Sequence, residues 1–232
     1  MTPRMIAELY DLLVDIGQDA EAGVLVLTGA GGPGNGFCPG ADIKHRLSGQ
    51  AAQEILEDGP AKPEVRQLAR VIRELPVVTV AAINGAVAGA GLGLALACDV
   101  RVAARSARFA TAFLARGLSG DMGVTWNLTR LVGPGRAREI CLLTDKFTAD
   151  EAAQFGIVSR VWDDDVFLEQ VDLLTHRLGS FSPPALKSLK ANLIDAERLD
   201  LATYLEVEIE RHLAVGQTPE SRALFEQFLD GR

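Results

Sequence analysis

The chain has 232 residues, 48% of them hydrophobic, which is enough to bury one sizeable core, so we expect a single domain. A formal net charge of −8 argues against nucleic acid as a partner, and no apolar run reaches the roughly 18 residues that a membrane span needs. Cys38, Cys98 and Cys141 are too scattered for a metal site or a disulfide framework, which favours a cytoplasmic protein without a bound metal.

Hydrophobic periodicity predicts alternating helices and strands, the pattern of an α/β fold. In chain order we expect a helix over 3–19, a strand over 24–28, a helix–loop–helix over 51–75, a strand over 77–83 and a helix over 92–98. Strands over 99–104 and 109–110, helices over 124–132 and 137–143, and a strand over 158–162 follow. Residues 166–228 are expected to be helical, with breaks at 182–184 and at Gly216.

Two glycine-rich segments are the most informative feature of the chain. They are FCPGADI over 37–43 and NGAVAGAG over 84–91. The second lies between a buried strand and a helix, so Ala90 stands where unpaired N–H groups and the positive end of the helix dipole are expected. Glycines there let a ligand approach the backbone closely. Two such donors aimed at one point would form an oxyanion hole, whereas either segment alone could be a tight turn without a ligand.

These segments and three further blocks resemble the crotonase (enoyl-CoA hydratase/isomerase) superfamily. The family patterns F-C-x-G-A-D-[IL] and N-G-x-x-x-G-[GA]-G match 37–43 and 84–91. The blocks 103–109 and 117–133, and the pattern E-A-x-x-x-G-[IL]-V at 151–158, follow in the family's order. Any one block is weak evidence, but the ordered set is specific.

The resemblance implies a crotonase-like ββα spiral with two twisted sheets over 1–162 and a C-terminal helical region over 163–232 used in trimerisation. It implies an acyl-CoA substrate, no cofactor apart from the coenzyme A of that substrate, and a homotrimer or a dimer of trimers. Family members usually begin with a β-hairpin before the first helix. This chain starts at that helix, so we expect the hairpin to be missing, which puts full activity in question.

The resemblance also assigns roles to residues. The backbone N–H groups of Ala41 and Ala90 would be the oxyanion-hole donors. Hydratases of the family carry their two catalytic glutamates at the positions that are Gly93 and Phe113 here. Neither residue can transfer a proton, so hydration by two glutamates is not expected. The residues expected to contact coenzyme A or substrate are Gly40, Asp42, Ile43, Lys44, Gly89, Gly91, Leu92, Phe113 and Leu118.

Asp121 is the acid that remains in this region. Isomerase branches of the family, the ring-epoxide isomerases among them, place a proton-shuttling aspartate at this motif position. The alternative is that Asp121 caps the helix that follows. With Phe113, Leu92, Leu118 and Trp126 as an apolar wall, burial would raise the pKa of Asp121, whereas the N-terminus of the following helix would lower it, and the sequence does not decide between the two effects.

The sequence therefore predicts an acyl-CoA isomerase in which one aspartate shuttles the proton. Weak hydratase or thioester hydrolase activity and a non-catalytic acyl-CoA-binding paralogue are the alternatives. Lys190, in the C-terminal helical region, is a candidate contact for a coenzyme A phosphate, from a neighbouring subunit.

Overall fold

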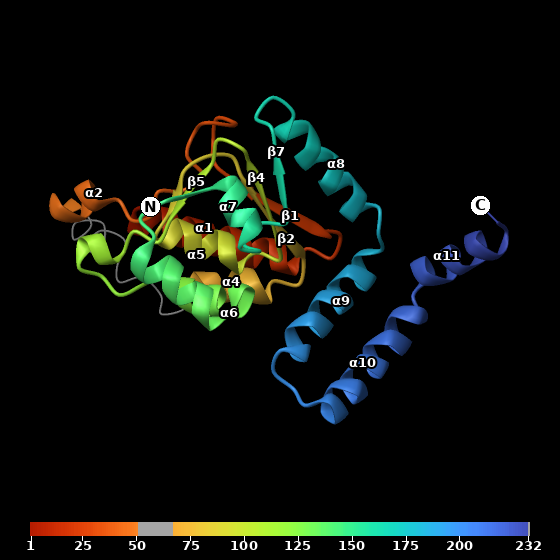
Figure 1. Ribbon diagram of the computed structural model, residues 1–232. Coiled ribbons are helices and arrows are strands. Elements are labelled where there is room, and N and C mark those ends of the chain that lie inside the picture. Colours follow the sequence, from red (N-terminus) through yellow and green to blue (C-terminus); the bar gives the residue numbers. More distant parts are fainter. Residues whose placement is uncertain (51–66, 232) are drawn as a thin grey trace.

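The computed structural model describes residues 1–50 and 67–231. The predicted helix–loop–helix over 51–75 therefore lies largely outside the described residues, apart from α4 (Leu68–Glu74) at its end. Elsewhere the chain alternates helices and strands (Figure 1), which confirms the predicted α/β class.

Two sheets form the core. The larger sheet is parallel throughout, with strand order β1-β2-β4-β7. The smaller has the order β3-β5-β6, in which β3 and β5 are parallel and β5 and β6 antiparallel. The strands are β1 (Val24–Thr28), β2 (Val78–Ile83), β3 (Val87–Ala88), β4 (Val100–Ala104), β5 (Arg108–Ala110), β6 (Phe147–Thr148) and β7 (Arg160–Trp162).

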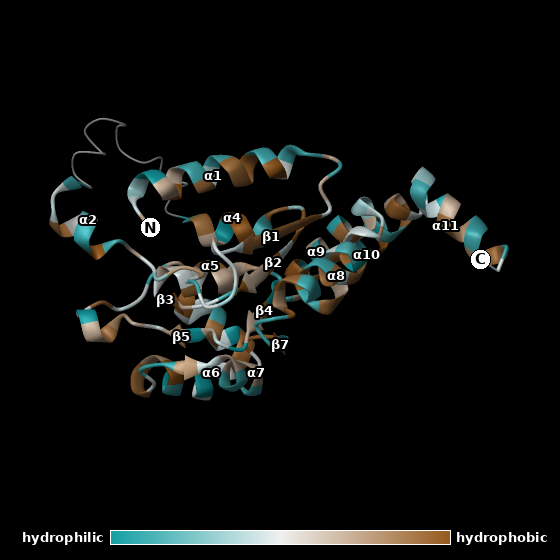
Figure 2. Ribbon diagram, turned by 90° about the horizontal axis from the view of Figure 1, so that it is seen from above, coloured by the Kyte–Doolittle hydropathy of each residue, from teal (hydrophilic) through white to brown (hydrophobic). Residues whose placement is uncertain are grey.

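The larger sheet is covered on both faces, as parallel sheets usually are. Side chains alternate along each strand, so Val80 and Ala82 of β2 pack with Phe167 of α8 (Phe167–Gly179) on one face. Ala81 and Ile83 belong to the main core on the other face. That core also takes in residues of α1 (Pro3–Gln18), α4, α5 (Ala90–Ala97) and α6 (Val124–Leu143), the helices grouped beside the sheet in Figures 1 and 2.

Helix α5 lies at the centre of this packing. All eight of its residues are buried, and each is glycine, alanine or leucine. A helix that is apolar on every side must be surrounded by protein, and the small residues let neighbouring elements approach its backbone. After β2, the chain therefore passes through the second glycine-rich segment and continues directly into the buried helix α5.

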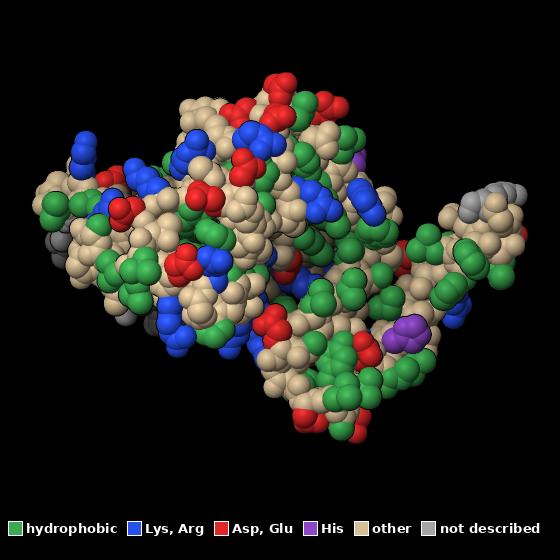
Figure 3. Space-filling model, in the orientation of Figure 1, with side chains coloured by type: hydrophobic (Ala, Val, Ile, Leu, Met, Phe, Trp, Pro, Cys, Tyr) green, Lys and Arg blue, Asp and Glu red, His purple; other side chains and the backbone are tan. Residues whose placement is uncertain are grey.

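The C-terminal helices extend away from the core (Figure 1). They are α9 (Pro183–Ala196), α10 (Leu201–Gly216) and α11 (Pro219–Leu229); the breaks before α9 and after Gly216 were predicted, whereas the break between α9 and α10 was not. No residue of α10 or α11 is buried, and hydrophobic side chains gather along this part of the surface in Figure 3. The most exposed of them include Leu201, Leu205, Ile209, Leu213, Phe225, Phe228 and Leu229.

Several short elements were missed by the sequence pattern. They are α2 (Ile43–Leu47), β3, β6, the 3₁₀ turn over Leu114–Arg116 and α7 (Ala149–Gln154). The two helices expected over 124–132 and 137–143 are confirmed as the two arms of α6, which meet at a kink where Gly133 has a non-helical φ of 75° before Pro134. Elements of two to six residues are too short to show a hydrophobic period.

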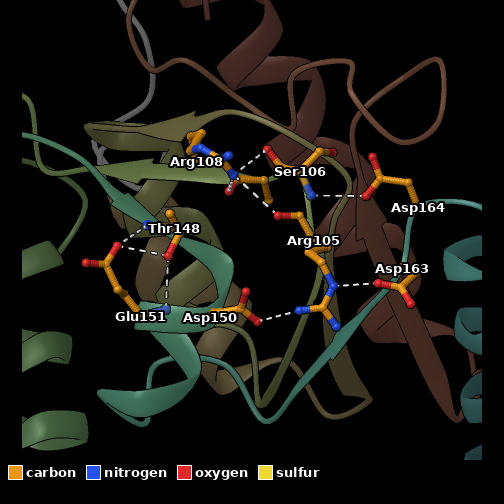
Figure 4. A network of polar contacts seen from close by, with 9 residues as sticks. Arg105, Ser106, Arg108, Thr148, Asp150, Glu151, Asp163 and Asp164 are labelled. Atoms are coloured by element: carbon orange, nitrogen blue, oxygen red, sulfur yellow. Dashed lines mark hydrogen bonds and ion pairs between the residues drawn. The ribbon is translucent and has the colours of Figure 1, made fainter.

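A polar network ties three segments of the core together (Figure 4). Arg105, after β4, pairs with Asp150 of α7 at 2.7 Å and with Asp163 after β7 at 2.5 Å. The adjacent backbone N–H of Ser106 donates to Asp164. Glu151 completes a capping box with Thr148 at the start of α7. The block 103–109 is thus tied to Asp150, which directly precedes the block 151–158, and to the segment after β7.

Candidate active site

A cavity of about 210 Å³ lies where the two glycine-rich segments meet the loop before α6. Eight residues singled out from the sequence line it, namely Gly40, Ala41, Ile43, Gly89, Ala90, Phe113, Leu118 and Asp121. Five further residues that were not predicted from the sequence also line it, namely Pro39, Ala112, Arg116, Ser119 and Gly120. Four of these five are next to predicted residues in the chain, whereas nothing in the sequence pattern pointed to Arg116 as a site residue.

The two glycine-rich segments are held against each other by backbone hydrogen bonds. Cys38 N–H donates to Ala86 O at 3.1 Å, and Ala88 N–H donates to Cys38 O at 3.0 Å. The contact depends on glycine, because a Cβ atom at position 91 would lie 2.6 Å from Cys38 Cβ. At Gly40, with a φ of 92°, a Cβ would lie 2.9 Å from Ala88 O. The glycines therefore bring two loops within backbone contact.

Ala41 and Ala90, whose backbone N–H groups are the predicted donors, both line the cavity. Helix α5 begins at Ala90, and its N-cap Gly89 offers no side-chain acceptor. Among the described residues, no backbone carbonyl accepts from the N–H of Ala41 or Ala90. These donors, with the positive end of the α5 dipole behind Ala90, can stabilise negative charge on a carbonyl oxygen.

Asp121 lies at the rim of the cavity and does not cap α6. Its carboxylate accepts a hydrogen bond from Met122 N–H at 2.8 Å, outside the helix. The N-cap of α6 is Gly123, which has a φ of 67° and no side-chain hydrogen bond. The capping role considered for Asp121 is therefore not the observed one, and the carboxylate is exposed at the cavity.

The apolar wall expected around Asp121 is incomplete. Phe113 is buried and lines the cavity, but Leu118 is 48% exposed, and Leu92 belongs to the core rather than to the cavity lining. Trp126 is exposed and instead contacts two arginines, Arg130 and Arg73, which lie 3.6 and 4.9 Å from its ring centroid. The expectation of a buried Asp121 was wrong, because two of the four wall residues face other parts of the molecule.

The positions of the two glutamates of family hydratases hold no acid. Phe113 fills one of them, with its ring near Gly89. At the other, a Cβ atom on Gly93 would lie 2.5 Å from Met122 Cβ and 2.6 Å from Met122 O. The backbone around Met122 thus takes the space that a side chain at position 93 would need.

Three other residues predicted to contact substrate lie outside this cavity lining. Asp42 caps α2 by accepting from His45 N–H at 2.9 Å, and this hydrogen bond lowers the pKa of Asp42. Lys44 is exposed on α2, and Gly91 is buried against Cys38.

Lys190 is not available to a coenzyme A phosphate. Its side chain is 3% exposed, pairs with Asp99 at 2.8 Å and donates to Val77 O at 2.9 Å. Desolvation lowers the pKa of Lys190. The expected phosphate contact was wrong, because nothing in the pattern of one helix reveals partners as far back in the chain as Asp99 and Val77.

Backbone strain is concentrated at the cavity. In the part of the chain that the structure describes, Ala112 and Met122 are the non-glycine residues with positive φ, at 60° and 48°. Ala112 lines the cavity and Met122 directly follows Asp121. Such conformations cost about 1–3 kcal/mol each and cluster at functional sites, which marks this cavity as the candidate site.

Among residues 1–50 and 67–231, no three histidine, cysteine or acidic side chains are grouped as metal ligands would be. None of the described helices has the length and apolar character needed to cross a membrane.

Comparison with known proteins shows which family the chain resembles. The model of the enoyl-CoA hydratase/isomerase family matches residues 1–232. The 1,2-epoxyphenylacetyl-CoA isomerase of Escherichia coli is 34% identical over 240 residues, which cover 99% of this chain and 86% of that protein. The crotonyl-CoA hydratase of Syntrophomonas wolfei is 30% identical over 227 residues, covering 98% and 85% of the two chains.

Solved structures agree. The crystal structure of an enoyl-CoA hydratase from Bacillus anthracis superposes with a TM-score of 0.86 at 30% identity, covering 100% of this chain and 88% of that one. This likeness confirms the predicted crotonase-like fold. With the ordered motifs and the packed glycine segments, these findings establish that the chain belongs to the enoyl-CoA hydratase/isomerase family, the crotonase superfamily.

Proposed function

We propose that the protein is an acyl-CoA isomerase in which Asp121 moves a proton on a thioester held by the N–H groups of Ala41 and Ala90. The observation that carries the proposal is the shared cavity, which is lined by both donors and by one carboxylate. The exclusion of a side chain at Gly93 and the phenylalanine at 113 argue against a two-carboxylate hydration.

The proposed chemistry needs one base and one anion site. The Asp121 carboxylate takes a proton from the α- or γ-carbon of an unsaturated acyl-CoA, and the electron pair moves toward the thioester oxygen. The two N–H groups stabilise the resulting enolate, and each such donor contributes about 2.7–4 kcal/mol in comparable sites. Protonated Asp121 then returns the proton to the other carbon, and the double bond has moved.

The wider context of the proposal follows the same family. The acyl-CoA carries its own coenzyme A, so the reaction needs no further cofactor. We propose a homotrimer or a dimer of trimers, which the exposed apolar side chains of α10 and α11 support because water-exposed stripes of this size favour association. A cytoplasmic setting is consistent with the free thiols Cys38, Cys98 and Cys141.

Proton exchange measured by NMR tests the function. Wild type and Asp121→Asn are incubated in deuterated water with a 3-enoyl-CoA and with a saturated acyl-CoA. We expect double-bond migration or deuterium incorporation in the wild type and a rate at least about 100-fold lower in Asp121→Asn. Asp145→Asn, which removes an exposed carboxylate outside the cavity, should keep the wild-type rate.

Two outcomes would contradict the proposal in different ways. Full activity of Asp121→Asn would remove Asp121 from the chemistry. Tight acyl-CoA binding without exchange in either protein would favour a non-catalytic acyl-CoA-binding protein.

A further inference from the structure

The contact between α5 and the loop before α6 is closer than any side chain at position 93 would allow. A Cβ on Gly93 would stand 2.5 Å from Met122 Cβ, 2.6 Å from Met122 O and 3.1 Å from its carbonyl carbon. Real Cβ atoms do not approach other atoms so closely, and here two of the three neighbours are backbone atoms. The loop therefore packs on α5 at Met122 because residue 93 has no side chain.

That contact fixes the residue next to Asp121. Met122 has a φ of 48°, a strained value for a side-chain-bearing residue, and its N–H donates to the Asp121 carboxylate at 2.8 Å. The flanking glycines Gly120 and Gly123 have φ values of 146° and 67°. Val124 N–H donates to the backbone carbonyl of Asp121. The Asp121 carboxylate thus belongs to a short segment with several positive φ values, and Met122 is the residue of that segment that packs on α5.

We propose that Gly93 is a positioning residue, which sets Asp121 at the cavity through the packing of Met122 on α5. The inference rests on the proposed isomerase function and deepens it. Because no side chain fits at position 93 while Met122 is seated there, a second carboxylate at 93 and the present position of Asp121 exclude each other. The packing thus favours moving a proton over adding water, since hydration needs a group to deprotonate water and another to protonate carbon.

The first test compares kcat and KM for double-bond migration in a glycine pair. In Gly93→Ala the new methyl group displaces the loop, and we expect kcat to fall about 100-fold, the usual cost of an ångström-scale misplacement, with KM within about threefold. Gly135→Ala is the matched control, because a Cβ at that helical glycine meets nothing within 4 Å. It should leave both constants unchanged.

Rescue separates positioning from a general loss of structure. In Gly93→Ala/Met122→Gly the second change removes the Met122 Cβ, and a glycine at position 122 has the backbone freedom to move its carbonyl away from the new methyl group. We expect the double variant to regain at least tenfold in kcat over Gly93→Ala. Gly93→Glu should lose isomerisation without gaining hydration of a 2-enoyl-CoA.

A readout that needs no activity keeps this inference separate from the proposed function. The chain has three methionines, Met1, Met5 and Met122, so a methionine-methyl NMR spectrum has three signals, and Met122→Gly assigns the third. Gly93→Ala should move the Met122 signal toward that of an unpacked methyl, and Asp121→Asn should also shift it.

The results divide clearly. Wild-type kcat or an unmoved Met122 signal in Gly93→Ala would overturn the positioning role, as would an equal collapse of kcat and substrate affinity without rescue. A wild type that shows no isomerisation or exchange would refute the proposed function, and the Met122 signal would still decide whether Gly93 seats the loop.

Discussion

The two ends of α5 differ in how their polar groups are satisfied. At the C-terminal end, Asp99 accepts from Thr79 N–H at 2.7 Å and from Thr79 Oγ1 at 2.9 Å, and Lys190 completes the pair at 2.8 Å. At the N-terminal end, the described residues leave the N–H of Ala90 without a backbone acceptor, beside an exposed carboxylate. One short helix thus carries a closed, structural end and an open end that faces the cavity.

The difference teaches where function is to be sought in this fold. Buried polar groups are almost always paired, so the paired end reports on stability. Donors left open on a cavity, next to strained backbone, are available to a ligand. Changes at the closed end should act on the free energy of unfolding, and changes at the open end on catalysis.

The largest effect is expected at the closed end. Lys190→Met leaves Asp99 and the carbonyl of Val77 without their buried partner, and we expect a loss of about 3–5 kcal/mol in the free energy of unfolding. Lys187→Met is the control, because Lys187 donates to Ala20 O near the surface and should cost about 1 kcal/mol or less. Urea titrations at one protein concentration measure both. Equal losses would mean that the buried pair has no special role.

Breaking the open end should lower kcat before it unfolds the protein. Gly91→Ala forces a methyl group against Cys38 and pushes the two glycine-rich segments apart. We expect kcat for isomerisation to fall about 100-fold and the free energy of unfolding by about 1–3 kcal/mol. In Gly36→Ala, the new Cβ would meet Ala86 O at an ordinary 3.7 Å, so this variant should behave like the wild type. Wild-type kinetics in Gly91→Ala would show that the spacing of the donors is not critical.

The closed end should also make the protein less stable at alkaline pH. Burial raises the pKa of the Cys98 thiol from 9.0 to about 12. Between these two pKa values the folded state keeps a proton that the unfolded state releases. The contribution of the Cys98 thiol to the free energy of unfolding is therefore complete below pH 9 and is lost as the pH rises toward 12. Between pH 8 and pH 10 the wild type should lose about 1.4 kcal/mol more than Cys98→Ala in urea titrations. Parallel losses would contradict the assignment.

The smallest effect concerns strain at the open end. Ala112→Gly relieves a φ of 60°, a conformation that costs an alanine about 1–2 kcal/mol, but adds flexibility to the unfolded chain. We expect a net stabilisation of about 0.5 kcal/mol together with a several-fold drop in kcat, because strain at a site holds its groups in place. Thermal unfolding and kinetics measure the two changes. A variant that is less stable than the wild type would show that Ala112 is not strained.

Much of the open end could be predicted because it consists of backbone. Positions such as Gly40 and Ala90 stand in motifs whose glycines and strand-to-helix turn dictate where N–H groups point. Long strands and helices, such as β2 and α1, show their period in the sequence. The α/β class was therefore within reach of the sequence pattern, and the two-sheet core was implied by the family resemblance.

The environments of the individual side chains could not be predicted from the sequence. The burial of Lys190 depends on Asp99 and Val77, which lie far away in the chain, and the exposure of Asp121 depends on where Leu92 and Trp126 pack. The seat of Met122 on Gly93 is equally invisible in a pattern, because it follows from backbone approach rather than from residue type. Packing of distant segments decided each of these.

The close approach of Met122 to Gly93 also limits how this protein can change over evolutionary time. Most replacements at position 93 must collide with the loop, so an acid gained there by a single mutation would first damage the existing site. A lineage that acquired the new residue would need to rebuild 120–123 earlier or at the same time. The order of mutations therefore matters, because the lack of a side chain at position 93 restricts which residues α5 and the loop can accept together.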